Sequence, residues 1–402
     1  MASIAQELNN LGFASVLAVT GKDNRSDASQ LRHHFKKEPN SQFGSASLAA
    51  SSADPKRPTA VDSARVYPNL GIVYGTVDRS GLAALKADPR VSSVKPAPQL
   101  SLIRPVAGAG VVGKDVWGID ALGVRELWDQ GLSGEGIRVA HLDTGIDATH
   151  PALRKALAKF TEIDDSGREL PGAGPRESDD VLGHGTHTAA TLAGRAVAGR
   201  KVGVAPKAEL YSAMVIEGGD TVARVLGGMN WAIGEGVRVL SMSLGIRGLI
   251  TDFLDVIGVL RDSGVLPVIA VGNEGPGTSR SPGNYPLALS VGAHDSAKHI
   301  WDQSSSQQFV RRSQPLVPDV VAPGVDVVSA QSGGGWHTLS GTSMATPHVA
   351  GLAALLLQAK PETTVAKLEK AIFASARLGT IDKNRGGRGA VDARRALAAL
   401  LK

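Results

Sequence analysis

The chain has 402 residues, no cysteine, 42% apolar residues and a net charge of +5. This length and composition are typical of a soluble protein with two or three domains, and the lack of cysteine excludes disulfides, thiolate nucleophiles and cysteine-ligated zinc. No stretch reaches the roughly 20 apolar residues of a membrane helix, so we expect no membrane partner. The first 20 residues contain Glu7 but no lysine or arginine, unlike a signal peptide. We therefore expect a cytoplasmic protein if the sequence is complete, and a secreted one if a signal was removed.

The positive charge is concentrated near the start of the chain. Residues 1–113 carry 13 Lys/Arg and 8 Asp/Glu, whereas residues 114–402 carry 30 of each. Aromatic residues make up only 4% of the chain and the basic residues are dispersed, so we predict no nucleic-acid binding. A basic module that docks on a neighbouring domain is the preferred interpretation.

The first hundred residues mix strand and helix patterns. We predict strands at 12–19 and 69–77, a long loop at 38–63, a short helix at 80–87 and extended chain at 91–103. This pattern indicates a small α+β domain, which we assign to residues 1–108. Glycine and proline at 105–113 predict a flexible linker with a domain boundary inside it, and we assign residues 109–116 to the linker.

Residues 117–402 follow a different pattern, in which short apolar strands alternate with helices. The predicted strands are 137–142, 209–215, 237–243 and 266–271, and the predicted helices are 186–193, 221–234 and 252–263. Continuous apolar strands between helices predict an α/β fold with a mostly parallel central sheet and helices on both faces. Chemistry in such sheets lies at the carboxyl ends of the strands, where Asp143, Ser243 and Asn273 fall.

Three segments carry the residues that nucleophilic serine catalysis requires. Asp143 ends a predicted strand, His184 opens a predicted helix, and Ser343 opens the last long apolar helix. A serine at a helix start lies beside unpaired N–H groups that favour negative charge. Catalysis also needs an imidazole base and a carboxylate to orient it. An α/β-hydrolase would have its acid and histidine after the serine, and only His348 follows Ser343, on the same helix.

The three segments resemble the signatures of the subtilisin-like (subtilase) serine proteases, and their Asp-His-Ser order is the one the family shows. The resemblance runs from about residue 117 to 376 and implies that Asp143 orients, His184 acts as base and then acid, and Ser343 attacks. Asn273 lies in a segment similar to the family's oxyanion-hole sequence, which implies that its side-chain amide stabilises the developing oxyanion. The resemblance thus implies a serine endopeptidase.

The resemblance also implies a set of substrate-binding residues. An extended peptide is expected to add as a strand beside one segment and to face a second across the cleft. Arg280 is expected near the floor of the primary specificity pocket, where it favours an acidic side chain before the cut; a solvated loop arginine is the alternative. The implied residues are Gly218, Gly219, Ser243, Leu244, Gly245, Ala270, Val271, Gly272 and Arg280.

Other polar residues near these motifs have simpler interpretations. We interpret His187 and His348 as structural and expect Asp147 to brace the loop after Asp143, because no His-Glu-x-x-His pattern indicates a metal. His141 lies on the same side of its strand as Asp143, at a position where the family usually has an aliphatic residue. We interpret His141 as a packing residue, with tuning of Asp143 as the alternative.

The departures from the family concern calcium. The strong calcium site of subtilases uses an acidic residue where this chain has Ala152, and the loop 195–203 has no Asp or Asn. We therefore predict that this site is absent, that no metal or cofactor is needed for the chemistry, and that a weaker calcium site elsewhere is possible.

Residues 1–108 resemble the inhibitory prodomain of secreted subtilases, most closely at 71–96. This resemblance implies an autoinhibited zymogen that processes itself between about Leu102 and Lys114 and has its own prodomain as inhibitor. We expect a monomer that acts on protein or peptide substrates. The alternatives are a processing enzyme or macrocyclase for one precursor peptide, and a catalytically silent scaffold, which the complete set of four residues disfavours.

Overall fold

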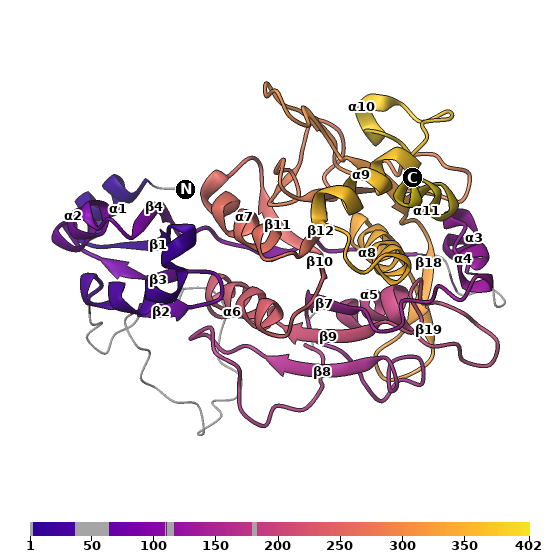
Figure 1. Ribbon diagram of the computed structural model, residues 1–402, viewed down its shortest axis with the longest axis horizontal. Helices are drawn as coiled ribbons and strands as arrows, with labels where there is room; N and C mark the ends of the chain where they lie inside the picture. Colours follow the sequence, from indigo (N-terminus) through magenta and orange to yellow (C-terminus); the bar gives the residue numbers. More distant parts are fainter. Residues whose placement is uncertain (1–2, 37–63, 109, 111–115, 179–182) are drawn as a thin grey trace. The chain divides into compact units, whose positions relative to one another are not determined.

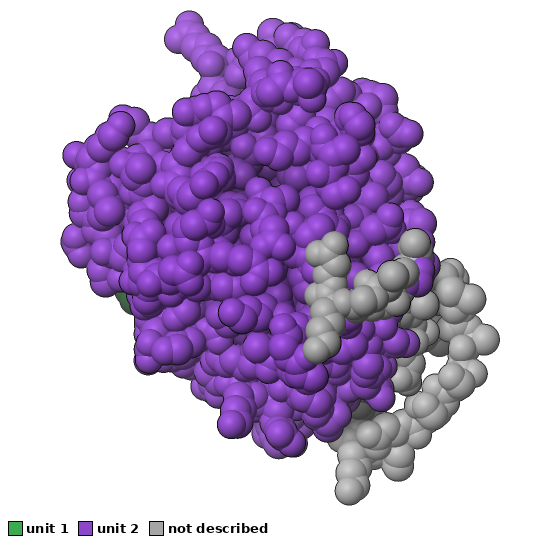
Figure 2. Space-filling model, turned by 90° about the vertical axis from the view of Figure 1, so that its right-hand side faces the viewer, with its two compact units in different colours: residues 1–97 green, residues 98–402 purple. Residues whose placement is uncertain are grey.

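The computed structural model describes residues 3–36, 64–108, 110, 116–178 and 183–402. They form two compact units, residues 1–97 and 98–402 (Figure 2). The boundary lies before residue 98 rather than after residue 108, because residues 101–102 and 106–107 form short strands that pair within the second unit. The whole loop predicted at 38–63 lies outside the described residues. None of the described helices combines the length and the apolarity needed to cross a membrane.

The first unit is an antiparallel sheet with helices, as the α+β pattern predicted. Its strands lie in the order β2-β3-β1-β4, and helix α2 (Arg79–Ala87) connects β3 to β4. Valines and leucines from the strands and helices fill its own apolar core, including the fully buried Val16 and Leu85. The other elements are α1 (Ile4–Leu11), β1 (Ala14–Thr20), η1 (Lys22–His34), β2 (Ala64–Tyr67), β3 (Ile72–Val77) and β4 (Val91–Pro96).

The second unit is built on a seven-stranded parallel sheet, which confirms the predicted fold class (Figure 1). The strand order is β17-β14-β12-β10-β7-β9-β8, and every neighbouring pair is parallel. The strands in chain order are β7 (Arg138–Asp143), β8 (Leu157–Glu162), β9 (Glu209–Met214), β10 (Val239–Met242), β12 (Leu266–Ala270), β14 (Leu289–His294) and β17 (Val320–Pro323). Asp143 is the last residue of β7, an interior strand next to the central strand β10.

Helices cover both faces of this sheet. Helix α5 (His184–Ala193) reaches Asp143 through Thr188, whereas α6 (Thr221–Gly234) packs Gly228 on Leu142, whose side chain points to the opposite face. The connections β8–α5–β9 and β9–α6–β10 step in the same direction across the sheet but lie on opposite faces. They therefore have opposite handedness, and one of them departs from the usual right-handed rule. This departure places His184 on the face that Asp143 occupies.

Helix α8 (Thr342–Ala359) packs against α5 and the sheet in the largest core cluster. Residues Thr342 to Leu357 are all buried, because the apolar run after Ser343 leaves no polar face to solvent. The remaining helices are α3 (Trp117–Leu122), α4 (Arg125–Asp129), η2 (Thr251–Phe253), α7 (Leu254–Asp262), α9 (Val365–Ser375), α10 (Lys383–Gly386) and α11 (Ala393–Leu401).

The short strands outside the main sheet include two that the sequence did not predict as strands of the second unit. Strand β5 (Ser101–Leu102) pairs with β11 (Leu244–Arg247), and β6 (Val106–Ala107) pairs with β19 (Trp336–Ser340). The prediction of a flexible linker was therefore wrong for Val106 and Ala107, because these residues gain backbone hydrogen bonds from a distant strand. The others are β13 (Arg280–Ser281), β15 (Gln307–Gln308), β16 (Leu316–Val317) and β18 (Val327–Ala330).

Candidate active site

Asp143 and His184 form a buried hydrogen-bonded pair. Oδ1 of Asp143 lies 2.6 Å from Nδ1 of His184, and both side chains are almost completely buried. The pair arises because β7 ends at Asp143 and α5 begins at His184, next to one another on the same face of the sheet. The contact orients the ring so that Nε2 is the free nitrogen, and Nε2 makes no hydrogen bond within the described part of the chain.

The carboxylate of Asp143 is held by donors on both oxygens. Oδ1 also accepts from the backbone N–H of Thr144 at 2.8 Å, and Oδ2 accepts from the hydroxyl of Thr188 at 3.2 Å. Burial alone raises the pKa of Asp143, but the charge of His184, the nearby ring of His141 and the hydrogen bond from His184 outweigh burial and hold the pKa far below its usual value. Asp143 is therefore ionised across the physiological range.

Ser343 is the second residue of α8 and lies in its first turn, two residues after Gly341, which precedes the helix. The side chain is buried, and its hydroxyl donates to the backbone carbonyl of Ile103 at 2.9 Å. The helix start places positive partial charge beside Oγ. The hydroxyl of Ser343 is thus engaged by the chain itself rather than by Nε2 of His184.

Asn273 follows strand β12 and reaches the start of α8. Its Oδ1 accepts from the backbone N–H of Thr342 at 3.0 Å and from the Thr342 hydroxyl at 2.8 Å. These two bonds fix the orientation of the amide, so that Nδ2 points away from Thr342. Nδ2 donates to the backbone carbonyl of Arg104 at 2.8 Å. The residues predicted as nucleophile and oxyanion donor therefore contact neighbouring carbonyls of one peptide.

That peptide is residues 100–108, which we call the cleft segment. It pairs in antiparallel register with β11, with Leu102 opposite Leu244 and Ser101 opposite Gly245. The N–H of Ile103 continues this ladder and donates to the carbonyl of Ser243 at 3.1 Å. Beyond Ser343, Val106 pairs with Ser340 in β19 and the N–H of Gly108 donates to Thr338. The cleft segment thus runs past the serine as an added strand on both sides.

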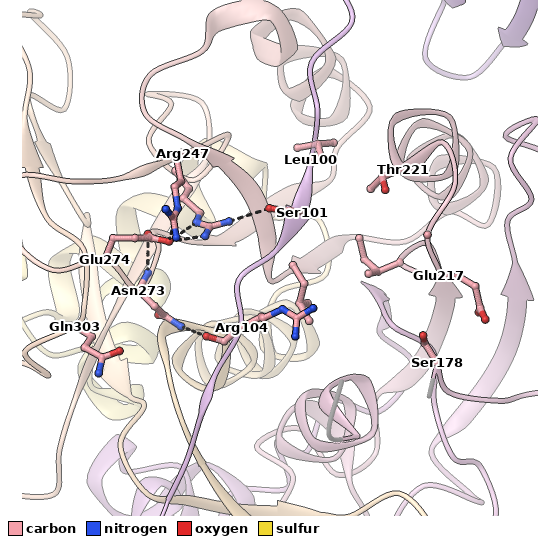
Figure 3. A pocket seen from close by; sticks show the side chains of 14 residues that line it. Leu100, Ser101, Arg104, Ser178, Glu217, Thr221, Arg247, Asn273, Glu274 and Gln303 are labelled. Atoms are coloured by element: carbon pink, nitrogen blue, oxygen red, sulfur yellow. Dashed lines mark hydrogen bonds and ion pairs between the residues drawn. The ribbon is translucent and has the colours of Figure 1, made fainter. Parts of the chain in front are cut away.

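A cavity of about 620 Å³ flanks the cleft segment. In Figure 3 the strand with Ser101 and Leu102 passes between Arg247, Glu274 and Asn273 on one side and Thr221, Glu217 and Ser178 on the other. Among the predicted substrate-binding residues, Ser243, Leu244 and Gly245 pair with the cleft segment, and Gly218 and Arg280 line the cavity. A side chain at Gly219 would collide with Asp165.

The other three predicted substrate-binding residues, Ala270, Val271 and Gly272, lie behind the cavity. Ala270 and Val271 are fully buried. The carbonyl of Val271 accepts from the N–H of Arg280, and the carbonyl of Gly272 accepts from the N–H of Ser305 and the hydroxyl of Thr342. In this structure their backbone groups serve the fold and hold the wall that carries Asn273.

Arg280 is buried and paired, unlike a solvated loop arginine. Its Nε lies 2.8 Å from Oε1 of Glu274, and the side chain is only 8% exposed. Its Nη1 donates to Oγ of Ser101 at 3.1 Å. Burial raises the pKa of Glu274, but hydrogen bonding and the charge of Arg280 outweigh burial and lower it. The cation expected in the specificity pocket is thus paired with Glu274, which also pairs with Arg247, and it contacts Ser101, two residues before Ile103.

The sequence did not predict several polar residues that support the pair. Glu177 is half-buried and accepts from Thr144 and Thr186, which lie close to Asp143 and His184 in the sequence. Burial raises the pKa of Glu177. Residues 179–182 next to it lie outside the described residues. Glu177 sits in a loop without periodicity, and only its position shortly before the His184 motif could have indicated it.

The other residues discussed in the sequence have structural partners. His187 is buried, donates to the carbonyl of Val327 and stacks on His337. His348 lies inside the core, and its ring bonds the carbonyl of Met344. Asp147 accepts from the N–H groups of Thr149 and Gly333 and so braces its loop.

The region of the predicted missing calcium site folds onto itself. Ala152 is buried, and its carbonyl accepts from the N–H of Arg195 at 2.7 Å. Within the described ranges, no cluster of three or more His, Asp or Glu side chains could hold a metal ion. The absence of a calcium site at Ala152 stays a prediction.

Comparison with known proteins agrees with this geometry. The model of the subtilase family, Peptidase_S8, matches residues 134–394. M-protease of Shouchella clausii (strain KSM-K16) is 36% identical over 275 residues, 67% of either chain. Subtilisin Savinase of Lederbergia lenta is 38% identical over 248 residues, which cover 61% of this chain and 85% of the relative. Intracellular serine protease of Paenibacillus polymyxa is 38% identical over 251 residues, 60% of this chain and 72% of the relative. The chain therefore belongs to the subtilase family and is a subtilisin-like serine endopeptidase of protein or peptide substrates.

Proposed function

We propose that Asp143, His184 and Ser343 act as a catalytic triad and that the described chain is the autoinhibited form. The observation that carries the proposal is the 2.6 Å bond from His184 to Asp143, on the same sheet face as a helix-terminal serine. Nε2 of His184 is buried, unbonded within the described residues and available to take a proton. The cleft segment supports the second part, since it lies across Ser343 as a substrate would.

In the first half-reaction, Oγ of Ser343 attacks the carbonyl carbon of the substrate while its proton moves to Nε2 of His184. The carbonyl oxygen becomes an oxyanion and accepts from Nδ2 of Asn273, whose orientation Thr342 fixes. The tetrahedral intermediate collapses, the C–N bond breaks, and His184 gives its proton to the leaving amine. An acyl-enzyme ester on Ser343 remains.

In the second half-reaction, water attacks the ester carbonyl and gives a proton to His184. The C–O bond to Ser343 breaks, and the proton returns to Oγ. Asp143 stays ionised throughout and stabilises the imidazolium that forms twice in each cycle. The proposed chemistry uses protein groups and water alone.

The register of the cleft segment explains why it inhibits. The carbonyl of Ile103 accepts from the hydroxyl of Ser343, while Asn273 donates to the next carbonyl, that of Arg104. The carbonyl nearest the nucleophile is therefore not the one bound to Asn273, and attack on it gains no stabilisation from this oxyanion donor. The carbonyl that Asn273 does bind belongs to the Arg104–Pro105 bond, whose nitrogen carries no hydrogen.

Self-processing then requires a small shift of the cleft segment. When the carbonyl of Ile103 moves to Asn273, the bond between Ile103 and Arg104 becomes the reactive one. This bond lies inside the predicted interval from Leu102 to Lys114. We further propose that unit 1 is the inhibitory and folding module of a monomeric zymogen, based on the prodomain-like pattern at 71–96.

The test is intact-mass analysis of the purified full chain and of Ser343→Ala. We expect the wild type to be cut after Ile103 and the variant to stay at full length. The matched control is Ser290→Ala, which removes another buried serine hydroxyl, on β14, and should be processed normally. Cutting of pure Ser343→Ala would refute self-processing.

The triad has a separate readout. Mature wild type should react with a fluorophosphonate probe, whereas Ser343→Ala and His184→Ala should not. If mature wild type does not react with the probe, the triad assignment is wrong, even if processing occurs. A peptide library then measures how many different sequences the mature enzyme cleaves. Cleavage of one sequence alone would favour a dedicated processing enzyme over a general protease.

A further inference from the structure

A second histidine lies against the catalytic aspartate. His141 is two residues before Asp143 on β7 and is only 1% exposed. Its Nε2 lies 3.6 Å from Oδ2 of Asp143, the oxygen that His184 does not contact. The carboxylate is therefore placed between two imidazole rings, one on each oxygen.

The ring of His141 is part of a continuous hydrogen-bonded chain. Nδ1 lies 3.1 Å from Oγ of Ser212 on β9, and Nε2 lies 2.9 Å from Oγ1 of Thr188 on α5. Thr188 in turn lies 3.2 Å from Oδ2 of Asp143. One set of protons satisfies every member: Ser212 donates to Nδ1, the Nε2–H donates to Thr188, and the Thr188 hydroxyl donates to Asp143.

Thr188 depends on His141 for this role. Its hydroxyl has one proton and lies near three acceptors, which are Oδ2 of Asp143 and the carbonyls of His184 and Gly185. A donor arriving from His141 occupies the lone pairs of Oγ1 and fixes its position in front of the carboxylate. Without that donor, the hydroxyl can turn toward the helix carbonyls, which are 3.0 and 3.2 Å away.

The other ionisable groups on the elements around β7 have partners elsewhere. The helices that pack on β7 are α5, α6 and α8. On α5, His187 bonds Val327; on α8, His348 bonds Met344; on α6, Arg224 pairs with Asp165.

One further ionisable group, Glu177, bears on the charge of the Asp143 carboxylate. Glu177 interacts electrostatically with Asp143 but makes its hydrogen bonds to Thr144 and Thr186. On the neighbouring strands, residues level with His141 are Ser212 and Ser241. The described ionisable groups that contact the carboxylate of Asp143 are thus His184 and His141.

We propose that His141 is a positioning residue that, through Thr188 and by direct contact, holds Oδ2 of Asp143 and sets the pH above which His184 acts as a base. The proposal rests on the triad proposed above. The hydrogen bond from Thr188 and the contact with His141 partly offset the negative charge of the Asp143 carboxylate. The carboxylate therefore stabilises protonated His184 less than it would without them. Removing the donor therefore makes His184 hold its proton to higher pH, and the acid limb of kcat/KM moves upward.

The experiment is the pH profile of kcat/KM on a short peptide substrate, with mature wild type, His141→Leu and His141→Gln. In His141→Leu the acid limb should rise by about 0.5 to 1 pH unit, the size expected for one hydrogen bond. Below that limb kcat/KM should fall by about 3- to 10-fold relative to wild type, from the same shift. Gln keeps an amide N–H and a carbonyl, so His141→Gln should return the limb to the wild-type position.

Two further variants keep the proposal testable if His141→Leu does not fold. Thr188→Val keeps the shape of the side chain and removes the hydroxyl, so its acid limb should rise in the same direction. The control is His294→Leu, which removes a buried histidine on β14 that bonds Asp295 and should leave the limb unchanged.

The outcomes separate this proposal from the proposed triad. If His141→Leu or Thr188→Val is folded and active and keeps the acid limb of the wild type, the positioning role is wrong. It is also wrong if the limb shifts in His141→Leu and His141→Gln does not restore it. Inactive wild type, by contrast, overturns the triad assignment. A purely structural role for His141 lowers the melting temperature without moving the limb.

Discussion

Nδ2 of Asn273 donates to the carbonyl of Arg104 at 2.8 Å, one residue after the carbonyl that accepts from Ser343. The nucleophile and the oxyanion donor thus act on two different peptide groups of the cleft segment. Catalysis requires both to act on one carbonyl, since an attacked carbonyl without a donor gains no transition-state stabilisation. This offset of one residue separates an inhibitor from a substrate that binds in the same groove.

The first prediction concerns the cleft segment as a ligand. A synthetic peptide of residues 98–108 should inhibit the mature enzyme competitively and survive intact at Arg104–Pro105. N-methylation at Ile103 removes the N–H that donates to Ser243 and should weaken inhibition by roughly 5- to 10-fold, the worth of one such hydrogen bond. N-methylation at Gln99, whose N–H makes no backbone bond to other described residues, is the control. Equal inhibition constants for the two methylated peptides would contradict the observed register.

The second prediction concerns Asn273. Asn273→Ala should lower kcat by about 10²- to 10³-fold and leave KM nearly unchanged, because the amide acts on charge that appears only in the transition state. This magnitude is taken from subtilisin, a member of the same family. Steady-state kinetics of both proteins on one peptide measure the two constants separately. A rise in KM with kcat preserved would show that Asn273 binds ground-state substrate instead.

The third prediction concerns substrate preference at Arg280. Because Glu274 neutralises Arg280, wild type should show little preference for Asp or Glu directly before the cut. Arg280 touches Ser101, the third residue before the proposed cut, so Glu274→Ala should raise kcat/KM by about 5-fold for peptides with Asp there. Glu217→Ala removes a carboxylate from the same cavity without contact to Arg280 and should leave the preference unchanged. If wild type prefers Asp or Glu directly before the cut, Arg280 acts in the primary specificity pocket, as the sequence suggested.

The fourth prediction concerns stability and pH. Burial raises the pKa of Asp319 to about 7, although the N–H of Ser290 and the charge of Arg388 oppose the rise. A carboxyl whose pKa is higher in the folded state favours folding at low pH, and this contribution is lost as pH rises from about 4 to about 7. In a Ser343→Ala background, Asp319→Asn should therefore gain stability relative to its parent over this range, by at most about 4 kcal/mol.

Urea unfolding at pH 4.5, 6 and 8 measures this difference. Asp302→Asn, which changes an exposed aspartate, is the control and should show a difference that does not vary with pH. A constant difference between Asp319→Asn and its parent would show that Asp319 ionises normally in the folded protein.

The meeting of Asp143 with His184 was implied by the resemblance to the subtilases, since His184 opens a helix and does not end a strand. The parallel sheet was predicted from the pattern of the sequence, because continuous apolar strands between helices form parallel sheets, and residues at strand ends such as Asp143 then share one edge. Asn273 was placed by the same argument. The position of His141 beside Asp143 followed from strand alternation, but its bonds to Ser212 and Thr188 depend on which elements become neighbours.

The features that the sequence did not predict depend on contacts between distant segments. Val106 and Ala107 lie in a Gly- and Pro-rich stretch typical of linkers, and their pairing with β19 has no local signal. The neutralisation of Arg280 by Glu274 requires a turn that brings residues six apart face to face. Glu177 belongs to a loop, where no periodicity marks burial.

The cleft segment is covalently continuous with the domain that it occupies. Its local concentration beside Ser343 is therefore set by the tether, at roughly millimolar values for short connections, and not by the amount of protein in solution. In the proposed zymogen, a single cut after Ile103 turns the part of this ligand before the cut into a separate molecule that obeys mass action. Dilution of the processed protein then releases activity by itself, whereas dilution of the uncut chain does not.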